Sequence, residues 1–278
     1  MNERDLLRIN GKPKQSNIVN RTTNISNVSK EYIRNLNVDF DVVFCVSSYN
    51  RFDKLTRLLE QVYDQESKYK FKFILLNDGS TDIRYNDLKY MYPDIIYLKN
   101  EVNGGKLYYW KTINKLWGEV SKLKTNAVIQ LDDDFVLCNT FLDRLLDVYY
   151  NKKSENNHYM IINFHLYNFS RKKPIESWWF DENEVFVDGG MIIDTQFLEL
   201  NNYALEMSKY TITLKTSSFV WVWVKDKLIE LGLKVYRTRK SLVWHDGNDD
   251  SKLHPNVRAE KRVYTKNFID NDLIYNKQ

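Results

Sequence analysis

Residues 40–150 alternate short apolar runs with segments in which apolar side chains recur at helical spacing. The apolar runs have strand length and are rich in β-branched and aromatic residues, as in strands that are buried on both faces. They are Asp41–Ser48, Phe71–Asn77, Asp94–Asn100 and Asn126–Leu131. Helical spacing relates Leu55, Leu58, Leu59 and Val62, then Trp110, Ile113, Trp117 and Val120, and Thr140–Tyr150 has the same character. This order predicts an α/β fold with a mostly parallel sheet flanked by helices.

The second half of the chain is less regular. Residues 158–169 and 184–194 have the pattern of strands, and we expect them to form a small antiparallel extension of the sheet. Residues 217–231 predict a helix that ends near Gly232 and is followed by a strand. Residues 241–245 predict a further strand that runs into a polar loop.

No linker rich in proline and glycine divides the chain, so we expect a single domain over residues 38–278 after a basic, polar N-terminal arm at residues 1–37. The formal net charge is only +4, and residues 1–36 hold seven basic and three acidic residues, so the arm accounts for the whole excess (7 − 3 = 4). Such an arm is either a solvated tail or a segment that meets an anionic partner, such as nucleic acid or a membrane surface.

The apolar runs and the cysteines favour one cellular compartment for the protein. The longest apolar runs are too short to cross a bilayer, and the N-terminal residues lack the apolar centre of a signal peptide. Cys45 and Cys138 lie in or beside strand-like runs, which favours buried thiols in a reducing compartment over a disulfide. We therefore expect a cytoplasmic protein with no integral membrane segment.

Polar residues follow three of the predicted strands at the point where each strand ends. These clusters are Ser47–Asn50, Asn77–Gly79 and Asp132–Asp134. Because ligands bind at the carboxyl ends of the strands in such sheets, we expect the three clusters to form one site.

The adjacent aspartates Asp132, Asp133 and Asp134 are more than a turn after a strand requires, and their charges repel one another. In extended chain Asp132 and Asp134 point the same way, and such a carboxylate pair suits Mn²⁺ or Mg²⁺ together with substrate phosphates. Asp133 then faces elsewhere, toward a sugar or a backbone amide. Capping of the following helix is the alternative, although it accounts for only one aspartate.

Four stretches between residues 40 and 150 resemble, in order, the motifs of family 2-type glycosyltransferases with the GT-A fold. They are the opening strand and helix VVFCVSSYNRFDKLTRLLEQV, the second-strand motif FILLNDGSTD, the turn NEVNGGK, and IQLDDDFVLCNTFLDRLL with its Asp-x-Asp motif. Each stretch is weak evidence alone, but the four together are specific. The resemblance implies a GT-A catalytic domain with a nucleotide-binding half at about residues 38–138 and an acceptor-side half at about residues 139–278.

The resemblance also implies roles for single residues. Seven positions match the nucleotide-sugar site of the family: Ser47, Tyr49, Asn50, Asp78, Lys106, Asp132 and Asp133. The first three match residues that meet the base and the ribose. Asp78 matches the carboxylate that bonds the uracil edge, and Lys106 matches a basic residue near the donor. Asp132 and Asp134 match the pair that binds the metal ion and, through it, the diphosphate.

The C-terminal stretch GLKVYRTRKSLVWHDG resembles the closing segment of the family, in which a strand ends in His-x-Gly. This makes His245 a candidate third metal ligand or a diphosphate contact, and a structural hydrogen-bonded histidine is the alternative. Trp178 or Trp179 is expected to line the acceptor side, because such rings stack on sugars.

The expected catalytic base is less clear. Inverting members carry a Glu-Asp pair whose Asp is the general base, but the matching position, near Val220 and Trp221, has no carboxylate. Asp188 in the stretch VDGG is the expected substitute, because its flanking glycines allow the close approach of a sugar. Weaker candidates are Asp181, Glu184 and Asp226. For each of the four, an ordinary turn aspartate or glutamate is the alternative.

The expected function is that of a metal-dependent glycosyltransferase that moves a sugar from a UDP-sugar to a hydroxyl acceptor, a glycan or glycan precursor. One alternative is glycosylation of a hydroxymethylated DNA base by an enzyme of the phage type, in which the basic arm contacts phosphates. The other is a non-catalytic nucleotide-sugar-binding protein, suggested by the missing Glu-Asp pair.

Overall fold

The computed structural model describes residues 37–155, 159–165, 189–233, 235–238, 240–246 and 268–269. The chain divides into two compact units, Met1–Glu31 and Tyr32–Gln278, and all described residues belong to the second. The predicted arm at residues 1–37 lies almost wholly outside the described residues, so its boundary stays a prediction. Among the helices that the structure describes, none has the length and apolar character needed to cross a membrane.

A seven-stranded sheet forms the centre of the second unit, in the order β3-β2-β1-β4-β7-β6-β8. Its strands are β1 (Phe40–Ser48), β2 (Phe71–Asn77), β3 (Ile96–Lys99), β4 (Thr125–Asp132), β6 (Ile161–Asn163), β7 (Met191–Asp194) and β8 (Val235–Arg237). Strands β3, β2, β1 and β4 run parallel, whereas β7 is antiparallel to both β4 and β6. A separate antiparallel pair joins β5 (Phe135–Leu137) to β9 (Val243–His245). The predicted α/β class with a mostly parallel sheet is confirmed.

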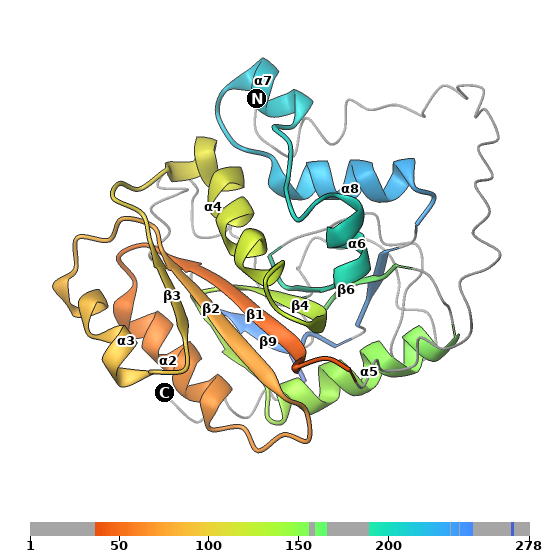
Figure 1. The fold of residues 1–278 in the computed structure, drawn as a ribbon, viewed down its shortest axis with the longest axis horizontal. Coiled ribbons are helices and arrows are strands. Elements are labelled where there is room, and N and C mark those ends of the chain that lie inside the picture. Colours follow the sequence, from red (N-terminus) through yellow and green to blue (C-terminus); the bar gives the residue numbers. More distant parts are fainter. Residues whose placement is uncertain are drawn as a thin grey trace. The chain divides into compact units, whose positions relative to one another are not determined.

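Helices cover both faces of this sheet (Figure 1). The helical elements are α2 (Phe52–Tyr63), the 3-10 helix η2 (Ile83–Asn86), α3 (Leu88–Met91), α4 (Gly105–Val120), α5 (Phe141–Glu155), α6 (Thr195–Leu200), α7 (Lys209–Leu214) and α8 (Val220–Glu230). Helices α2 and α5 pack against one face, and α4, α6 and α8 pack against the other.

Strand β1 shows why its residues form a central strand. Its successive side chains point to opposite faces, so Val42, Phe44 and Val46 enter the core beneath α2 and α5. Val43 and Cys45 enter the core beneath α4, α6 and α8. Full burial stabilises the fold by roughly 1.5–3 kcal/mol for each large apolar side chain. Polar residues are therefore excluded from the strand interior and gather at its carboxyl end.

The structure differs from the sequence-based expectation mainly in the second half. The predicted antiparallel strands are present, but β6 and β7 are only three and four residues long in the described part of the chain. Strand β5, directly after the aspartates, was not predicted, because three residues carry no readable periodicity. Helix α6 was also missed; Asp194 caps it by accepting a hydrogen bond from the amide of Gln196 at 2.9 Å.

Candidate functional site

The carboxyl end of β4 places the first aspartate of the triplet. Asp132 is the last residue of β4 and lies in register with Ser47 near the end of β1. The chain then turns through Asp133 and Asp134 before it enters β5. Asp132 is half-buried, whereas Asp134 is 1 % exposed. Two carboxylates from consecutive elements thus lie at one edge of the sheet.

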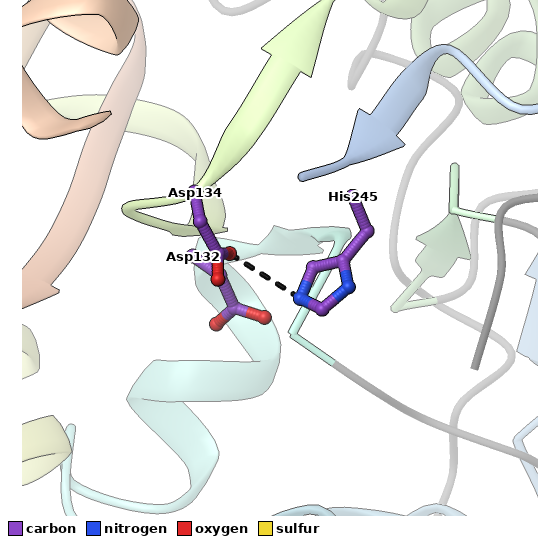
Figure 2. Close-up of side chains that lie close together, drawn as sticks. All are labelled: Asp132, Asp134 and His245. Carbon is purple, nitrogen blue, oxygen red and sulfur yellow. Dashed lines mark ion pairs between the residues drawn. The ribbon is translucent and has the colours of Figure 1, made fainter. Parts of the chain in front are cut away.

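The pairing of β5 with β9 brings His245 to these carboxylates. Phe135 lies opposite His245 in the antiparallel register, and the amide of Asp246 donates to the carbonyl of Asp134 at 3.0 Å. Nε2 of His245 lies 3.3 Å from Oδ1 of Asp134, and Figure 2 shows these two side chains and Asp132 facing one another. The predicted metal ligands, more than 100 residues apart in sequence, are therefore neighbours in space.

The donor set fits a divalent cation. One ligand atom from each of Asp132, Asp134 and His245 lies within 4.8 Å of the other two. A small divalent ion binds oxygen at about 2.1 Å, so ligands on opposite sides of it are about 4 Å apart, and little closing movement is needed. The imidazole suits Mn²⁺ better than Mg²⁺, which takes oxygen ligands. The metal-binding role of the three residues stays a prediction that this geometry supports.

The third aspartate faces a different set of partners. Asp133 accepts hydrogen bonds from the Ser48 hydroxyl at 2.6 Å and from Nη1 of Arg51 at 3.2 Å. The same Arg51 nitrogen also pairs with Asp134. The Ser48 hydroxyl lies 2.5 Å from the hydroxyl of Tyr85, which in turn accepts from the Arg51 amide at 3.0 Å. Arg51 thus supplies the positive charge that offsets the repulsion between two buried carboxylates.

The electrostatic state of the two buried carboxylates differs. Burial, and then the charge of Asp134, raises the pKa of Asp133 to about 6. Burial alone would raise the pKa of Asp134 as well, but contacts with His245 and the charges of Arg51 and Lys54 outweigh it and lower that pKa to about 2. Asp134 is therefore ionised at neutral pH, as a metal ligand must be.

Two glycines form the wall beside the acidic pair. A Cβ atom on Gly189 would lie 2.6 Å from both carboxylate oxygens of Asp132, and one on Gly190 would lie 2.7 Å from Cβ of His165. Only glycine allows the chain entering β7 to pass so close. The expectation that these glycines admit a sugar beside Asp188 stays a prediction, because Asp188 lies outside the described residues.

His165 lies behind the site. Its ring packs 4.9 Å from that of Phe135 and 5.8 Å from that of His245, measured between centroids. Burial, and then the proximity of His245, lowers the pKa of His165 to about 3, so it is neutral at physiological pH. It adds no charge beside the ligands.

The residues matched to the nucleotide lie at the ends of β1 and β2. Tyr49 is 37 % exposed, so its ring is available to a base. Asn50 holds the turn after β2, because its side-chain oxygen accepts from the Thr81 amide at 2.9 Å. Asp78 is buried and accepts from the side-chain amides of Asn100 at 2.6 Å and Asn103 at 3.2 Å. This carboxylate thus fixes the turn before α4, and its predicted contact with uracil stays a prediction.

The positions of the other predicted site residues say less about their roles. Lys106 lies in the first turn of α4, and its carbonyl accepts from the Ser218 amide at 2.8 Å. Asp226 lies on α8 and pairs with Lys209 at 3.6 Å. The expected base, two of its three alternatives and the expected acceptor-side tryptophans lie outside the described residues; these are Asp188, Asp181, Glu184, Trp178 and Trp179. Their roles stay predictions.

Sequence reasoning missed Arg51 and Tyr85, and it placed Ser48 in a polar cluster of the site without giving it a role. A signal for Arg51 was present, since three adjacent carboxylates that become buried require a cation and Arg51 directly follows the polar end of β1. Tyr85 gave no such signal, because it reaches the site from the 3-10 helix η2, in a loop with no periodicity.

Comparisons with known proteins bear on the family and the fold. Residues 43–180 match the model of the family described as glycosyl transferase family 2. Among solved structures, S. aureus TarS 1-349 in complex with UDP is 15% identical with a TM-score of 0.50, and the match covers 73% of this chain and 59% of that chain. A longer S. aureus TarS structure is 14% identical with a TM-score of 0.52, covering 73% and 36%.

At these identities the likeness to TarS concerns the fold alone, and the chain spans less than two thirds of the length of either TarS structure. No curated protein matches the sequence.

Proposed function

We propose that this chain, which belongs to glycosyl transferase family 2 through residues 43–180, is a glycosyltransferase that binds a nucleotide-sugar donor together with a divalent cation and transfers the sugar to a hydroxyl group. The observation that carries the metal-dependent part is the convergence of Asp132, Asp134 and His245, whose ligand atoms lie within 4.8 Å of one another at the carboxyl edge of the sheet.

The chemistry of the transfer explains the need for this arrangement. The bond between the sugar and the diphosphate breaks, and the leaving nucleoside diphosphate gains negative charge that a bound cation stabilises by several kcal/mol. The chain's own part is to hold ionised oxygen ligands where the diphosphate arrives. Contacts with His245 and the charge of Arg51 lower the pKa of Asp134 and so keep it ionised. The exposed ring of Tyr49 gives the base a surface on which to stack.

We propose UDP as the nucleotide of the donor. The motif that ends β2 resembles the one that bonds uracil in related enzymes, and the TarS structure with the similar fold holds UDP. Asp78 has to keep its contacts with Asn100 and Asn103 while it meets the base, which the four lone-pair directions of a carboxylate allow.

The acceptor proposed is a hydroxyl of a glycan or glycan precursor. No described residue favours DNA over a glycan, because the basic arm and the residues expected to line the acceptor side lie outside the described part of the chain. The cytoplasmic location expected from the sequence stays a prediction.

Slow hydrolysis of the donor gives a test that needs no known acceptor. Purified protein would be incubated with a panel of UDP-sugars and other nucleotide sugars, in Mn²⁺ or in EDTA, and the released nucleoside diphosphate measured. We expect UDP release from at least one UDP-sugar in Mn²⁺ and none in EDTA.

Two variants sharpen this test. Asp134→Ala removes an ionised ligand and should abolish the metal-dependent release. Asp147→Ala removes a carboxylate of α5 that pairs with Lys68 and should leave the release unchanged. Release that continues undiminished in EDTA, or in Asp134→Ala, would contradict the metal-dependent proposal. Failure of the wild-type protein to bind UDP in Mn²⁺ would contradict the donor.

A further inference from the structure

The strand that carries His245 has little of its own to hold it. β9 is three residues long, and within the described residues it pairs only with the three-residue strand β5. Two such strands are far below the size at which a sheet is stable by itself. Val243 anchors β9 in the core, where it is fully buried, but His245 is the last residue of the strand, so contacts just after it help to keep its imidazole beside Asp134.

Helix α2 supplies that support through Asp246, the residue after His245. Nζ of Lys54 donates to the carbonyl of Asp246 at 2.9 Å, and Nη1 of Arg57 donates to its carboxylate at 2.6 Å. The amide of Asp246 donates to the carbonyl of Asp134. The peptide next to the imidazole is therefore held at its amide, its carbonyl and its side chain.

These contacts belong to a row of cations on one helix. Arg51, Lys54 and Arg57 are spaced three residues apart at the start of α2, so they lie along one side of it. Arg51 meets Asp133 and Asp134, and the other two meet Asp246. One side of α2 therefore contacts both the aspartate turn that contains Asp134 and the residue that follows His245.

The Arg57 guanidinium makes its described hydrogen bond and ion pair with Asp246. Its Nε and Nη2 atoms are buried, and among the described residues they have no hydrogen-bond partner, so the pair with Asp246 is its one described ion pair. The two side chains are 30% and 42% exposed, so solvent screens the pair and its contribution to overall stability is small. Its geometric effect is larger, because it fixes the residue adjacent to a ligand.

We propose that the Arg57–Asp246 ion pair is a positioning contact that holds His245 against Asp134, so that Arg57 tunes metal affinity without touching the ion. This inference rests on the metal-binding part of the proposed function. Outer contacts that orient a metal-binding histidine commonly change affinity by about 10- to 100-fold. The exposed pair here should lie at the lower end of that range.

The test measures binding of Mn²⁺ alone, by calorimetry or by electron paramagnetic resonance of free Mn²⁺. Arg57→Gln and Asp246→Asn should each raise the Kd by about tenfold, and Arg57→Lys, which keeps one charged donor, should raise it less. Arg84→Gln is the matched control, because Arg84 also pairs with carboxylates, Asp53 and Asp82, that are not predicted ligands. It should leave the Kd unchanged.

A double-mutant cycle separates positioning from general loosening of the fold. In a His245→Ala background, Arg57→Gln should have no further effect on the Kd, because the group that it positions is absent. An unchanged Kd in both Arg57→Gln and Asp246→Asn would overturn the inference, as would a tenfold loss that persists without His245. If wild-type protein does not bind Mn²⁺ at all, the metal-binding part of the proposed function fails instead.

Discussion

The N-terminal and C-terminal halves of the chain contribute to the site in different ways. Strands β1 and β4 are nine and eight residues long, pair in parallel over most of their length and end in the polar residues of the site. Strands β6 and β9 have only three residues each, and β9 pairs with β5 in a separate two-stranded sheet. The acidic pair is therefore built into a rigid edge, whereas His245 reaches it through contacts between distant segments.

The difference predicts unequal effects of removing ligands from the two halves. Asp134→Ala should lower kcat/KM for the donor by at least about 100-fold, because the cation that it holds supplies several kcal/mol at the transition state. His245→Ala should lower it by about tenfold, since two carboxylates remain. Steady-state kinetics with a UDP-sugar in Mn²⁺ would measure both. Equal losses would contradict the view that the acidic edge is the principal part of the site.

The C-terminal half should be the easier one to destabilise by breaking a single contact. Lys153 of α5 and Asp194 at the end of β7 form an ion pair in which the side chains are 4% and 1% exposed. Tyr149 also donates to Asp194 at 3.1 Å. Asp194→Ala leaves a buried ammonium without this partner and should lower the free energy of unfolding by about 3–5 kcal/mol.

Urea denaturation would measure this loss. The control is Lys68→Met, which breaks the surface pair with Asp147 and should change stability by no more than about 1 kcal/mol. A loss below 1 kcal/mol for Asp194→Ala would show that the C-terminal half is not anchored by this pair.

Much of the N-terminal half could be predicted from the sequence, because its information is local. The alternation of Val42, Val43, Phe44 and Cys45 between two helix layers follows from strand geometry once both faces are known to be covered. The polar ends of β1, β2 and β4 then coincide, since parallel strands end at one edge. For this reason the grouping of Asp132 and Asp134 could be inferred from sequence.

The remainder of the site depends on contacts that no local pattern encodes. The register of Phe135 against His245 is set by two three-residue strands, and only the one that ends at His245 was predicted as a strand. The inward turn of Asp133 depends on Ser48, Arg51 and Tyr85, which come from three elements. Only the resemblance to a family pointed to His245, and nothing pointed to Tyr85.

The effect of adding a side chain at Gly189, beside Asp132, can be compared with the effect of adding one at Gly118, inside helix α4. Gly189→Ala would bring a Cβ within 2.6 Å of the Asp132 carboxylate, so it should displace that ligand, weaken Mn²⁺ binding by about tenfold and cost about 1–3 kcal/mol of stability. Gly118→Ala in α4 meets no atom within 4 Å and should stabilise the protein by about 0.5–1 kcal/mol. Calorimetric titration and thermal unfolding of both variants would distinguish them. An unchanged Mn²⁺ affinity in Gly189→Ala would argue against Asp132 as a ligand.

The neutral histidine behind the site predicts a dependence of stability on pH. The pKa of His165 falls from its usual 6.5 to about 3 on folding, mainly because the ring is buried. Between these values the unfolded chain binds more protons than the folded one, so stability decreases as the pH falls from about 6.5 toward 3, by at most about 1.4 kcal/mol per pH unit.

Asp133 acts in the opposite direction. Its pKa is raised to about 6, so the stability that this residue contributes to the fold falls as the pH rises from about 4 to 6. The difference between wild type and His165→Gln isolates the histidine, and denaturant titrations at several pH values should show a shallower acid loss in the variant. The same pH dependence in both proteins would contradict burial of a neutral His165.

The most direct test of the account is whether one metal ion is bound by residues of both halves. Electron spin-echo spectroscopy of bound Mn²⁺ reports directly coordinated ¹⁴N, and His245 is the one nitrogen donor in the described ligand cluster. We predict a ¹⁴N coupling in the wild-type protein that disappears in His245→Ala, while weaker Mn²⁺ binding through Asp132 and Asp134 persists. Saturable Mn²⁺ binding without any ¹⁴N coupling in the wild type would contradict the site described here.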